Sequence, residues 1–294
     1  MMSFQTKQAI PVFLLCLIYY SSCSVLNQEE PVPCYVNIES IKLKTTPNQG
    51  SASHKITDVW VFNDTEFLGM FQLPAKIPLL LYEEQNLTLQ AGIKENGIGS
   101  TPENYPFYSP LKVKLNLKAL QTITLTPEIT YLPTTKFHFI ENFENNSSFF
   151  SFLVNGLAEN SILPFSGNEV FEGKYTGKIQ LTKQAPTVTV GANAKLKHTF
   201  TPGQPVFLEL DYKAEIPCII GIQFYDTENT DETGIIVPIA GFKESANWNK
   251  IYFNIGNMLA ARKSIYYRII FNATLPEGKE NARILMDNIK LISF

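Results

Sequence analysis

The chain has 294 residues, of which 45% are hydrophobic, 12% aromatic and 17% charged. This balance excludes an intrinsically disordered protein, because such chains combine low hydrophobicity with high charge. The formal net charge is -3, and no cluster of lysine and arginine is present. Nucleic acid is therefore not expected as a partner, since phosphate backbones are bound by basic surfaces.

The first predicted element is an apolar run over residues 9–20, which follows a single positive charge at Lys7. With about a dozen residues it is too short to cross a bilayer, which requires about 20, and it predicts the hydrophobic core of a signal peptide. We therefore expect residues 1–22 to be removed and the mature chain to be exported.

Two small residues, Ser21 and Ser22, precede Cys23, and a polar, acidic segment follows over residues 23–33. This arrangement resembles the signal of bacterial outer-membrane lipoproteins of the Bacteroidota type. The resemblance implies a lipid on Cys23, a tether over residues 23–33, and a lipid-anchored location at the outer membrane, on the cell surface. The periplasmic leaflet stays open. Cleavage near Ser22 by an ordinary signal peptidase, giving a soluble secreted protein, is the alternative.

Once Cys23 is acylated, the mature chain keeps Cys34 and Cys218 as thiols. One lies at the start of the first predicted domain and the other lies deep in the second. We expect two free or buried cysteines and no disulfide framework, although a bond between them stays open.

Residues 34–131 consist of short alternating segments such as "YVNIESIKLKT" and "DVWVFND", separated by Pro, Gly and Asn. This pattern predicts an all-β fold, with about seven strands forming one immunoglobulin-like β-sandwich. The stretch "VWVFNDTEFLGMFQLPAKIPLLLYEEQNLTLQAGI" combines a hairpin with "LP" and an apolar strand. It resembles surface modules of the PEGA and carboxypeptidase-regulatory type, which implies no catalytic group.

A polar segment, "LPTTK" at residues 132–136, predicts a linker. The segments "FHFIENFENNSSFFSF", "FEGKYTGKIQL", "QPVFLELDYKA", "ANWNKIYFNIG" and "ARILMDNIKLISF" follow it. Together they make residues 137–294 similar to the jelly-roll β-sandwiches of carbohydrate-binding modules and galactose-binding-like domains. Fold alone does not decide function, because jelly rolls serve many purposes.

Catalytic motifs are missing from the sequence. His54, His138 and His198 are far apart, and none adjoins a serine or cysteine in a nucleophile motif. We also find no glycine-rich phosphate loop and no paired-cysteine zinc spacing. The sequence therefore indicates a non-catalytic protein. A hydrolase that uses two facing carboxylates stays open as a third reading.

A structural calcium ion is the cofactor that the jelly-roll resemblance implies, because such modules often use one to tie the opening strand to the closing strand. On this resemblance, the ligands would be Glu144, Glu172 and Asp287, which offer the oxygen atoms that Ca²⁺ prefers. The alternative is that Glu144 is solvated and that Asp287 caps a strand end. No other cofactor is expected.

A glycan-binding site requires a flat aromatic face beside groups that can bind hydroxyls. The chain has two tryptophans, Trp60 and Trp248, and Trp248 is expected to share a strand face with Tyr252. Trp248 and Tyr252 are therefore the candidate glycan-binding residues. A tryptophan that fills the core of a sandwich is the alternative.

The segment over residues 92–110 is long for a loop and contains Tyr105, Phe107 and Tyr108 next to prolines. Rigid aromatic residues of this kind are enriched in protein interfaces, so we take these three as partner-binding candidates. They could equally fold back and pack between the domains.

These features lead to two hypotheses of different classes. The first is an accessory or scaffold lipoprotein that binds another outer-membrane protein complex through the aromatic loop. The second is a surface lipoprotein that captures polysaccharide with its jelly roll. The identity of the partner or glycan and the oligomeric state are left open by the sequence.

Overall fold

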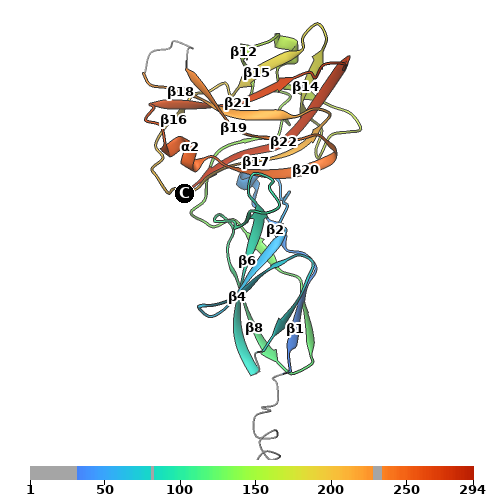
Figure 1. Cartoon of the computed structure of the whole chain (residues 1–294), viewed down its shortest axis with the longest axis vertical. Coiled ribbons are helices and arrows are strands. Elements are labelled where there is room, and N and C mark those ends of the chain that lie inside the picture. The colour runs from blue at the N-terminus through green and yellow to red at the C-terminus, as the bar shows by residue number, and fades with distance from the viewer. Residues whose placement is uncertain (1–31, 81–82, 228–233) are drawn as a thin grey trace, which may run out of the picture.

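The computed structural model describes residues 32–80, 83–227 and 234–294, and it confirms an all-β protein built mainly of antiparallel sheets (Figure 1). In these ranges there is one α-helix, α2 (Gly256–Ala260), with two short 3-10 helices, η1 (Pro47–Gln49) and η2 (Ala158–Asn160). None of the described helices is long and apolar enough to cross a membrane. The predicted signal peptide and Cys23 lie outside the described residues.

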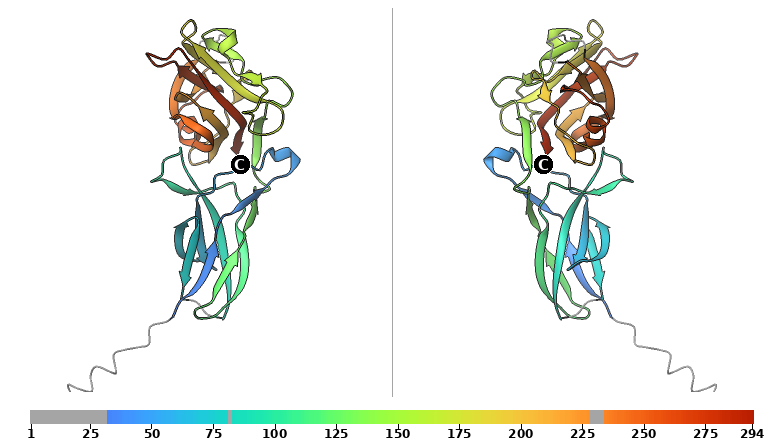
Figure 2. Two further views of the ribbon diagram at one scale, coloured as in Figure 1. Left: turned by 90° about the vertical axis from the view of Figure 1, so that its right-hand side faces the viewer. Right: turned by 90° about the vertical axis from the view of Figure 1, so that its left-hand side faces the viewer.

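The first unit is elongated and lies below the second unit in Figures 1 and 2. Its strands are β1 (Cys34–Ile38), β2 (Lys42–Lys44), β3 (Asp58–Asn63), β4 (Glu66–Gln72), β5 (Ala75–Leu79), β6 (Glu83–Lys94), β7 (Pro102–Asn104), β8 (Leu111–Leu117), β9 (Thr122–Leu125) and β10 (Glu128–Thr130). The five-stranded sheet has the order β4-β3-β6-β7, with β8 also paired to β6. The order β5-β1-β9 forms a second sheet, and β10 pairs with β2.

Alternation along the strands builds the core of the first unit. Val59 and Val61 of β3 and Leu87 and Leu89 of β6 are all buried, because every second side chain points to the same face of a strand. The hairpin between β3 and β4 turns at Asp64, whose φ of 49° is tolerated by Asp and Asn. Trp60 and Phe62 consequently point to the opposite face, away from this core.

The second unit is a β-sandwich of two sheets. Its strands are β11 (Lys136–Glu141), β12 (Phe152–Asn155), β13 (Leu163–Phe165), β14 (Thr176–Thr182), β15 (Thr187–Gly191), β16 (Leu196–Lys197), β17 (Val206–Ala214), β18 (Cys218–Tyr225), β19 (Ile235–Phe242), β20 (Ser245–Asn254), β21 (Tyr266–Thr274) and β22 (Asn281–Ser293). The β17 sheet has the order β13-β14-β22-β17-β20, with β11 on β22. The β18 sheet has the order β12-β15-β21-β18-β19, with β16 on β21.

The facing sides of these two sheets enclose the larger hydrophobic core. Leu208 and Leu210 of β17, Ile222 of β18 and Phe271 of β21 belong to it, and each is at most 1% exposed. The opposite side of the β17 sheet faces the first unit. The sequence places apolar residues on the inner side by alternation, and the outer side carries the residues that make the site.

Close packing explains one glycine in this unit. A Cβ atom on Gly177 of β14 would lie 2.3 Å from Cζ of Phe143 and 2.8 Å from Cγ2 of Ile162. Both neighbours are completely buried, so they have no room to retreat. Glycine is therefore required where the loop after β11 crosses this strand.

The two cysteines behave as predicted from their positions. Cys34 and Cys218 are both buried, and no disulfide joins them within the described residues. Burial raises the pKa of the Cys218 thiol to about 12. Cys34 belongs to the core of the first unit and Cys218 to the core of the second.

Candidate functional site

The two units meet where loops of the first unit cover the outer side of the β17 sheet. Tyr105, Phe107 and Tyr108, between β7 and β8, are 1%, 0% and 5% exposed at this junction. The ring of Tyr105 lies 5.1 Å from the rings of both Phe207 and Tyr252. The three residues predicted to bind a partner are thus buried between the units. They leave no aromatic surface for another protein, because the second unit already covers them.

A buried carboxylate holds this junction together. Glu209 of β17 is 0% exposed and accepts a hydrogen bond of 2.6 Å from the hydroxyl of Tyr105. The hydroxyl of Tyr131 lies 3.0 Å from each of its two carboxylate oxygens. Lys250 Nζ is 3.5 Å from Oε2. A buried charge is tolerated only when it is paired and hydrogen-bonded. The tyrosine hydroxyls of the first unit therefore stabilise the buried carboxylate of the second.

A second buried carboxylate lies beside the first. Asp211 Oδ1 accepts a hydrogen bond of 2.7 Å from Ser53 Oγ, and Oδ2 accepts one of 3.2 Å from the Asn288 amide. Lys250 Nζ lies 3.6 Å from Oδ2. The segment before β3 is thereby fixed to the β17 sheet.

Lys290 of β22 completes the network. It is 0% exposed and donates a hydrogen bond of 2.7 Å to the backbone oxygen of Ser51. Burial lowers its pKa to about 8, although the charge of Glu209 opposes this shift. Sequence reasoning missed the whole network. The available signal was the presence of Glu209, Lys250 and Lys290 inside otherwise apolar strands, which indicates a strand face covered by polar partners.

A cavity of about 300 Å³ opens at the edge of the junction. The residues that line it are Ser53, His54, Lys55, Phe171, Asp211, Trp248, Asn249 and Lys250. The first three come from the segment before β3, Phe171 comes from the loop between β13 and β14, and the others come from β17 and β20. Both units therefore contribute to one cavity.

Trp248 is half-buried in this cavity. Its ring lies 5.1 Å from the ring of Phe171, and its Nε1 donates a hydrogen bond of 3.0 Å to the backbone oxygen of Glu169. These two contacts fix the orientation of the indole. On the other side, Lys55 Nζ donates a hydrogen bond of 2.7 Å to Asn249 Oδ1, which links the two units at the cavity wall.

Tyr252, predicted to bind glycan together with Trp248, is 1% exposed and lies inside the junction. Its hydroxyl accepts a hydrogen bond of 2.9 Å from the backbone N–H of Lys55 and lies 3.3 Å from the hydroxyl of Tyr108. Burial raises its pKa well above the usual value. Tyr252 therefore stabilises the junction and offers no surface to a sugar, which corrects the expectation for this residue.

The three residues expected to bind calcium lie around one cavity. Glu144, Glu172 and Asp287 line a space of about 290 Å³ together with Asn142 and Gly173. Asp287 Oδ2 is buried and has no hydrogen-bond partner within the described residues. Burial raises the pKa of Asp287 to about 8, and the nearby charge of Glu172 adds to the shift. An orphaned oxygen of this kind would suit a cation.

Other features of the cavity count against a preformed metal site. Glu144 Oε1 already accepts hydrogen bonds of 2.9 and 3.0 Å from the backbone N–H groups of Lys174 and Tyr175. In the part of the chain that the structure describes, no group of three His, Cys, Asp or Glu side chains is placed to hold a metal ion. Calcium binding by Glu144, Glu172 and Asp287 therefore stays a prediction.

The histidines form no catalytic arrangement in the described ranges. His138 Nε2 lies 2.8 Å from Ser293 Oγ, and His198 Nδ1 lies 2.9 Å from Ser264 Oγ. No carboxylate among the described residues is hydrogen-bonded to either histidine, so neither pair has the third member that orients a catalytic base. Burial lowers the pKa of both.

Comparison with known proteins gives distant structural similarities. Neither a protein-family model nor a curated protein matches the sequence. A carbohydrate-binding module of the β-sandwich superfamily matches 80% of this chain and 84% of its own length, with 14% identity and a TM-score of 0.35. The xylan-binding domain CBM22-1 of Paenibacillus barcinonensis Xyn10C matches 54% and 94%, with 9% identity and a TM-score of 0.36.

A family 30 carbohydrate-binding module gives a similar result. It matches 55% of this chain and 88% of its own length, with 15% identity and a TM-score of 0.40. These scores mark a distant similarity to the β-sandwich architecture of carbohydrate-binding modules, and to the architecture alone.

Proposed function

We propose that this protein is a non-catalytic carbohydrate-binding protein and that the cavity beside Trp248 is its binding site. The observation that carries the proposal is the half-buried indole of Trp248, held in place by Phe171 and Glu169 at the wall of a polar cavity. Sugars are bound by this combination, because their C–H faces stack on flat aromatic rings while their hydroxyls require polar partners.

The polar partners come from both units. His54 and Lys55 come from the first unit and Asn249 comes from the second, and Lys55 Nζ donates a hydrogen bond of 2.7 Å to Asn249 Oδ1. Lys250 makes ion pairs at 3.5 and 3.6 Å, but its ammonium group has no hydrogen-bond partner within the described residues. It can therefore donate to a ligand oxygen. The cavity volume lies at the lower end of the range of about 300–1,000 Å³ typical of ligand sites, which fits a short segment of a glycan.

Affinity electrophoresis in gels that contain xylan, β-1,4-galactan, laminarin or pectin tests the proposal. Replacing Trp248 by Ala should weaken the affinity for the polysaccharide about tenfold, since the stacking surface is lost. The weaker affinity appears as reduced retardation in the gel. Asn247→Ala, an exposed neighbour on β20 that does not line the cavity, is the matched control. Equal retardation of the wild type and Trp248→Ala would overturn this site.

The finer fold assignment belongs to the same proposal. We assign the first unit to the immunoglobulin-like or PEGA type and the second to the jelly-roll type. The pairing of the opening strand β11 with the closing strand β22, in the middle of the β17 sheet, supports the second assignment.

A second candidate function is that of a lipid-anchored subunit of an outer-membrane complex, with the lipid on Cys23. One described feature favours the membrane part. Val32, Leu80 and Leu120 are 43%, 57% and 75% exposed. They lie together at one end of the first unit, because Cys34 pairs with Leu79 and the backbone N–H of Leu120 bonds to Pro33 O. An apolar tip beside the start of β1 suits a chain that is tethered to lipid from its N-terminal side.

Mass spectrometry of the N-terminal peptide from purified membranes tests the anchor. An acylated Cys23, absent from a Cys23→Ser variant, is the expected result. An unmodified N-terminus in the membrane fraction would contradict it. Co-purification of a stoichiometric membrane protein would support the subunit role, and a monomer recovered alone would count against that role while leaving the anchor intact.

A further inference from the structure

The outer side of the five-stranded sheet in the first unit carries an aromatic strip. It consists of Trp60 and Phe62 on β3 and Phe67 and Met70 on β4. Phe67 and Met70 are 51% and 38% exposed, and both residues of β3 are half-buried. The ring of Phe67 lies 5.6 Å from that of Trp60 and 5.2 Å from that of Phe62. Large apolar side chains gathered on an exposed sheet face mark an interaction site.

The position of the indole in this strip is built into the sheet. A Cβ atom on Gly92 of the neighbouring strand β6 would lie 3.1 Å from Trp60 Nε1 and 3.0 Å from Asp58 Cβ. The glycine thus leaves room for the ring to rest on the sheet. Trp60 Nε1 has no hydrogen-bond partner within the described residues. Trp60 is held by packing and presents its remaining surface outward.

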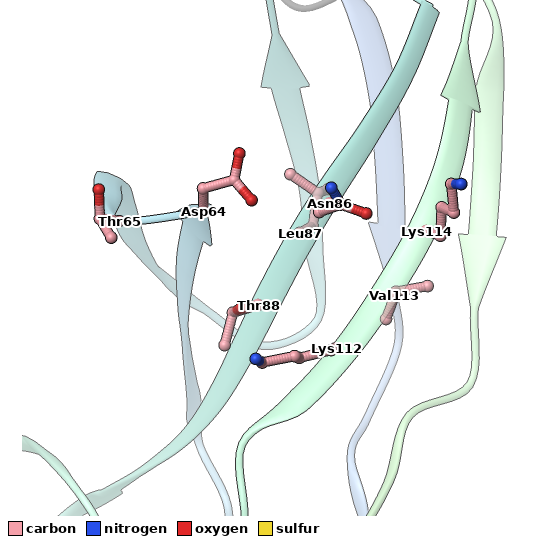
Figure 3. Close-up of a pocket in the computed structure, with 8 residues that line it drawn as sticks. All are labelled: Asp64, Thr65, Asn86, Leu87, Thr88, Lys112, Val113 and Lys114. Atoms are coloured by element: carbon pink, nitrogen blue, oxygen red, sulfur yellow. The ribbon is translucent and has the colours of Figure 1, made fainter.

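A polar groove adjoins the aromatic strip. Its volume is about 480 Å³, and it is lined by Asp64, Thr65, Asn86, Leu87, Thr88, Lys112, Val113 and Lys114. Figure 3 shows the Asp64–Thr65 turn on one side, β6 in the middle and the two lysines of β8 on the other side.

Strand register makes the strip and the groove continuous. Thr88 pairs with Phe62 on one side and with Lys112 on the other, so a single residue borders both. Two residues further along β6, Gln90 pairs with Trp60 and accepts a hydrogen bond from the Asn104 amide. Amides, a hydroxyl and ammonium groups therefore lie beside three aromatic rings on one face.

We propose that this face of the first unit binds a polysaccharide chain, with the aromatic strip stacking on sugar rings and the groove binding their hydroxyls. Protein interface cores are depleted in lysine and other charged groups. The groove instead places Lys112, Lys114, Asn86 and Thr88 next to the rings, which favours a glycan over a protein. The proposal stands independently of the Trp248 cavity, since the two sites share no residue.

Phe67→Ala is the first test, because half-exposed Phe67 can be truncated without opening the core. Lys112→Ser is a second variant in the groove. Leu157→Ala, which removes a similarly exposed apolar residue of the second unit outside both proposed sites, is the matched control. Affinity for xylan, β-1,4-galactan, laminarin and pectin is measured by affinity electrophoresis. We expect Phe67→Ala to weaken binding about tenfold and Leu157→Ala to leave it unchanged.

The outcomes separate the two sites. Loss of binding in Phe67→Ala with full binding in Trp248→Ala supports the aromatic strip and overturns the Trp248 cavity. The reverse result overturns the aromatic strip. If the wild type binds none of the four polysaccharides, a glycan is the wrong ligand for this face. The same conclusion follows if Phe67→Ala and Lys112→Ser bind polysaccharide as the wild type does and lose only the binding of a protein.

Discussion

The hydroxyl of Tyr105 in the first unit donates a hydrogen bond of 2.6 Å to Oε1 of Glu209 in the second, and neither residue is more than 1% exposed. The contact exists only while the units are docked. Undocking would leave the Glu209 carboxylate without its tyrosine partners and would expose the rings packed around Tyr105. The cavity beside Trp248, which takes side chains from both units, is therefore kept in shape by the junction.

Replacing Tyr131 by Phe should lower the free energy of unfolding by about 1.5–3 kcal/mol, the usual contribution of hydrogen bonds to a charged group. The hydroxyl lies 3.0 Å from both carboxylate oxygens of Glu209, and the substitution leaves the ring in place. Urea unfolding measures the change. Tyr35→Phe, at a half-buried position on β1, is the control. If both variants unfold at the same urea concentration, the carboxylate does not hold the junction.

Asp287 should make stability fall as pH rises. Its folded pKa is about 8, while the ordinary value is 3.8, so the folded state keeps a proton that the unfolded state has lost between these two values. The free energy of unfolding therefore decreases with rising pH over this window, by at most about 1.4 kcal/mol per pH unit for one proton. Asp287→Asn removes this term. Its stability relative to the wild type should be higher at pH 8 than at pH 5.

Urea unfolding of the wild type, Asp287→Asn and the exposed-site control Asp64→Asn at pH 5 and pH 8 checks this expectation. Parallel pH dependences in all three proteins would contradict it. Added calcium extends the experiment. An ion bound at Glu144, Glu172 and Asp287 would raise the melting temperature of the wild type and Asp64→Asn but not of Asp287→Asn, because binding to the folded state alone stabilises it. If calcium changed the melting temperature of none of the three proteins, the predicted calcium site would be wrong.

Alternation along strands predicted more of the fold than of the site. It identified an all-β chain and placed Trp60 and Phe62 on one strand face, because side-chain direction in a strand follows from sequence position alone. It could not show what covers a face. Tyr105, Phe107 and Tyr108 contact residues of β17 and β20 that lie a hundred or more positions away.

The same limit explains the two residues chosen for glycan binding. Trp248 and Tyr252 lie on the same face of β20, four residues apart. Trp248 nevertheless lines a cavity, whereas Tyr252 is buried. The difference depends on where the segment before β3 ends its contact with the β17 sheet. The end of this contact is set by how the two units dock, so the local sequence pattern of β20 cannot predict it.

Replacing Gly177 by Ala should destabilise the second unit by about 1–3 kcal/mol, the usual cost of overpacking a filled core. The new Cβ would lie 2.3 Å from Cζ of Phe143, and that ring is completely buried. Thermal unfolding followed by circular dichroism measures the effect. Gly99→Ala is the control, because no atom lies within 4 Å of the added Cβ. Equal melting temperatures would mean that Phe143 can move aside.

Cys218 should resist alkylation until the second unit unfolds. The thiolate is the reactive form, and with a pKa of about 12 only about one thiol in ten thousand is ionised at pH 8. The thiol is also 1% exposed, so a reagent cannot reach it without an opening of the sandwich. N-ethylmaleimide labelling of the Cys218 peptide, followed by mass spectrometry, should be slow in buffer and fast in guanidinium. An Ala246→Cys variant, at an exposed position on β20, reports the rate of an accessible thiol under the same conditions. If native Cys218 reacted as fast as that thiol, β18 would have to open readily, and the close packing of the two sheets would be wrong.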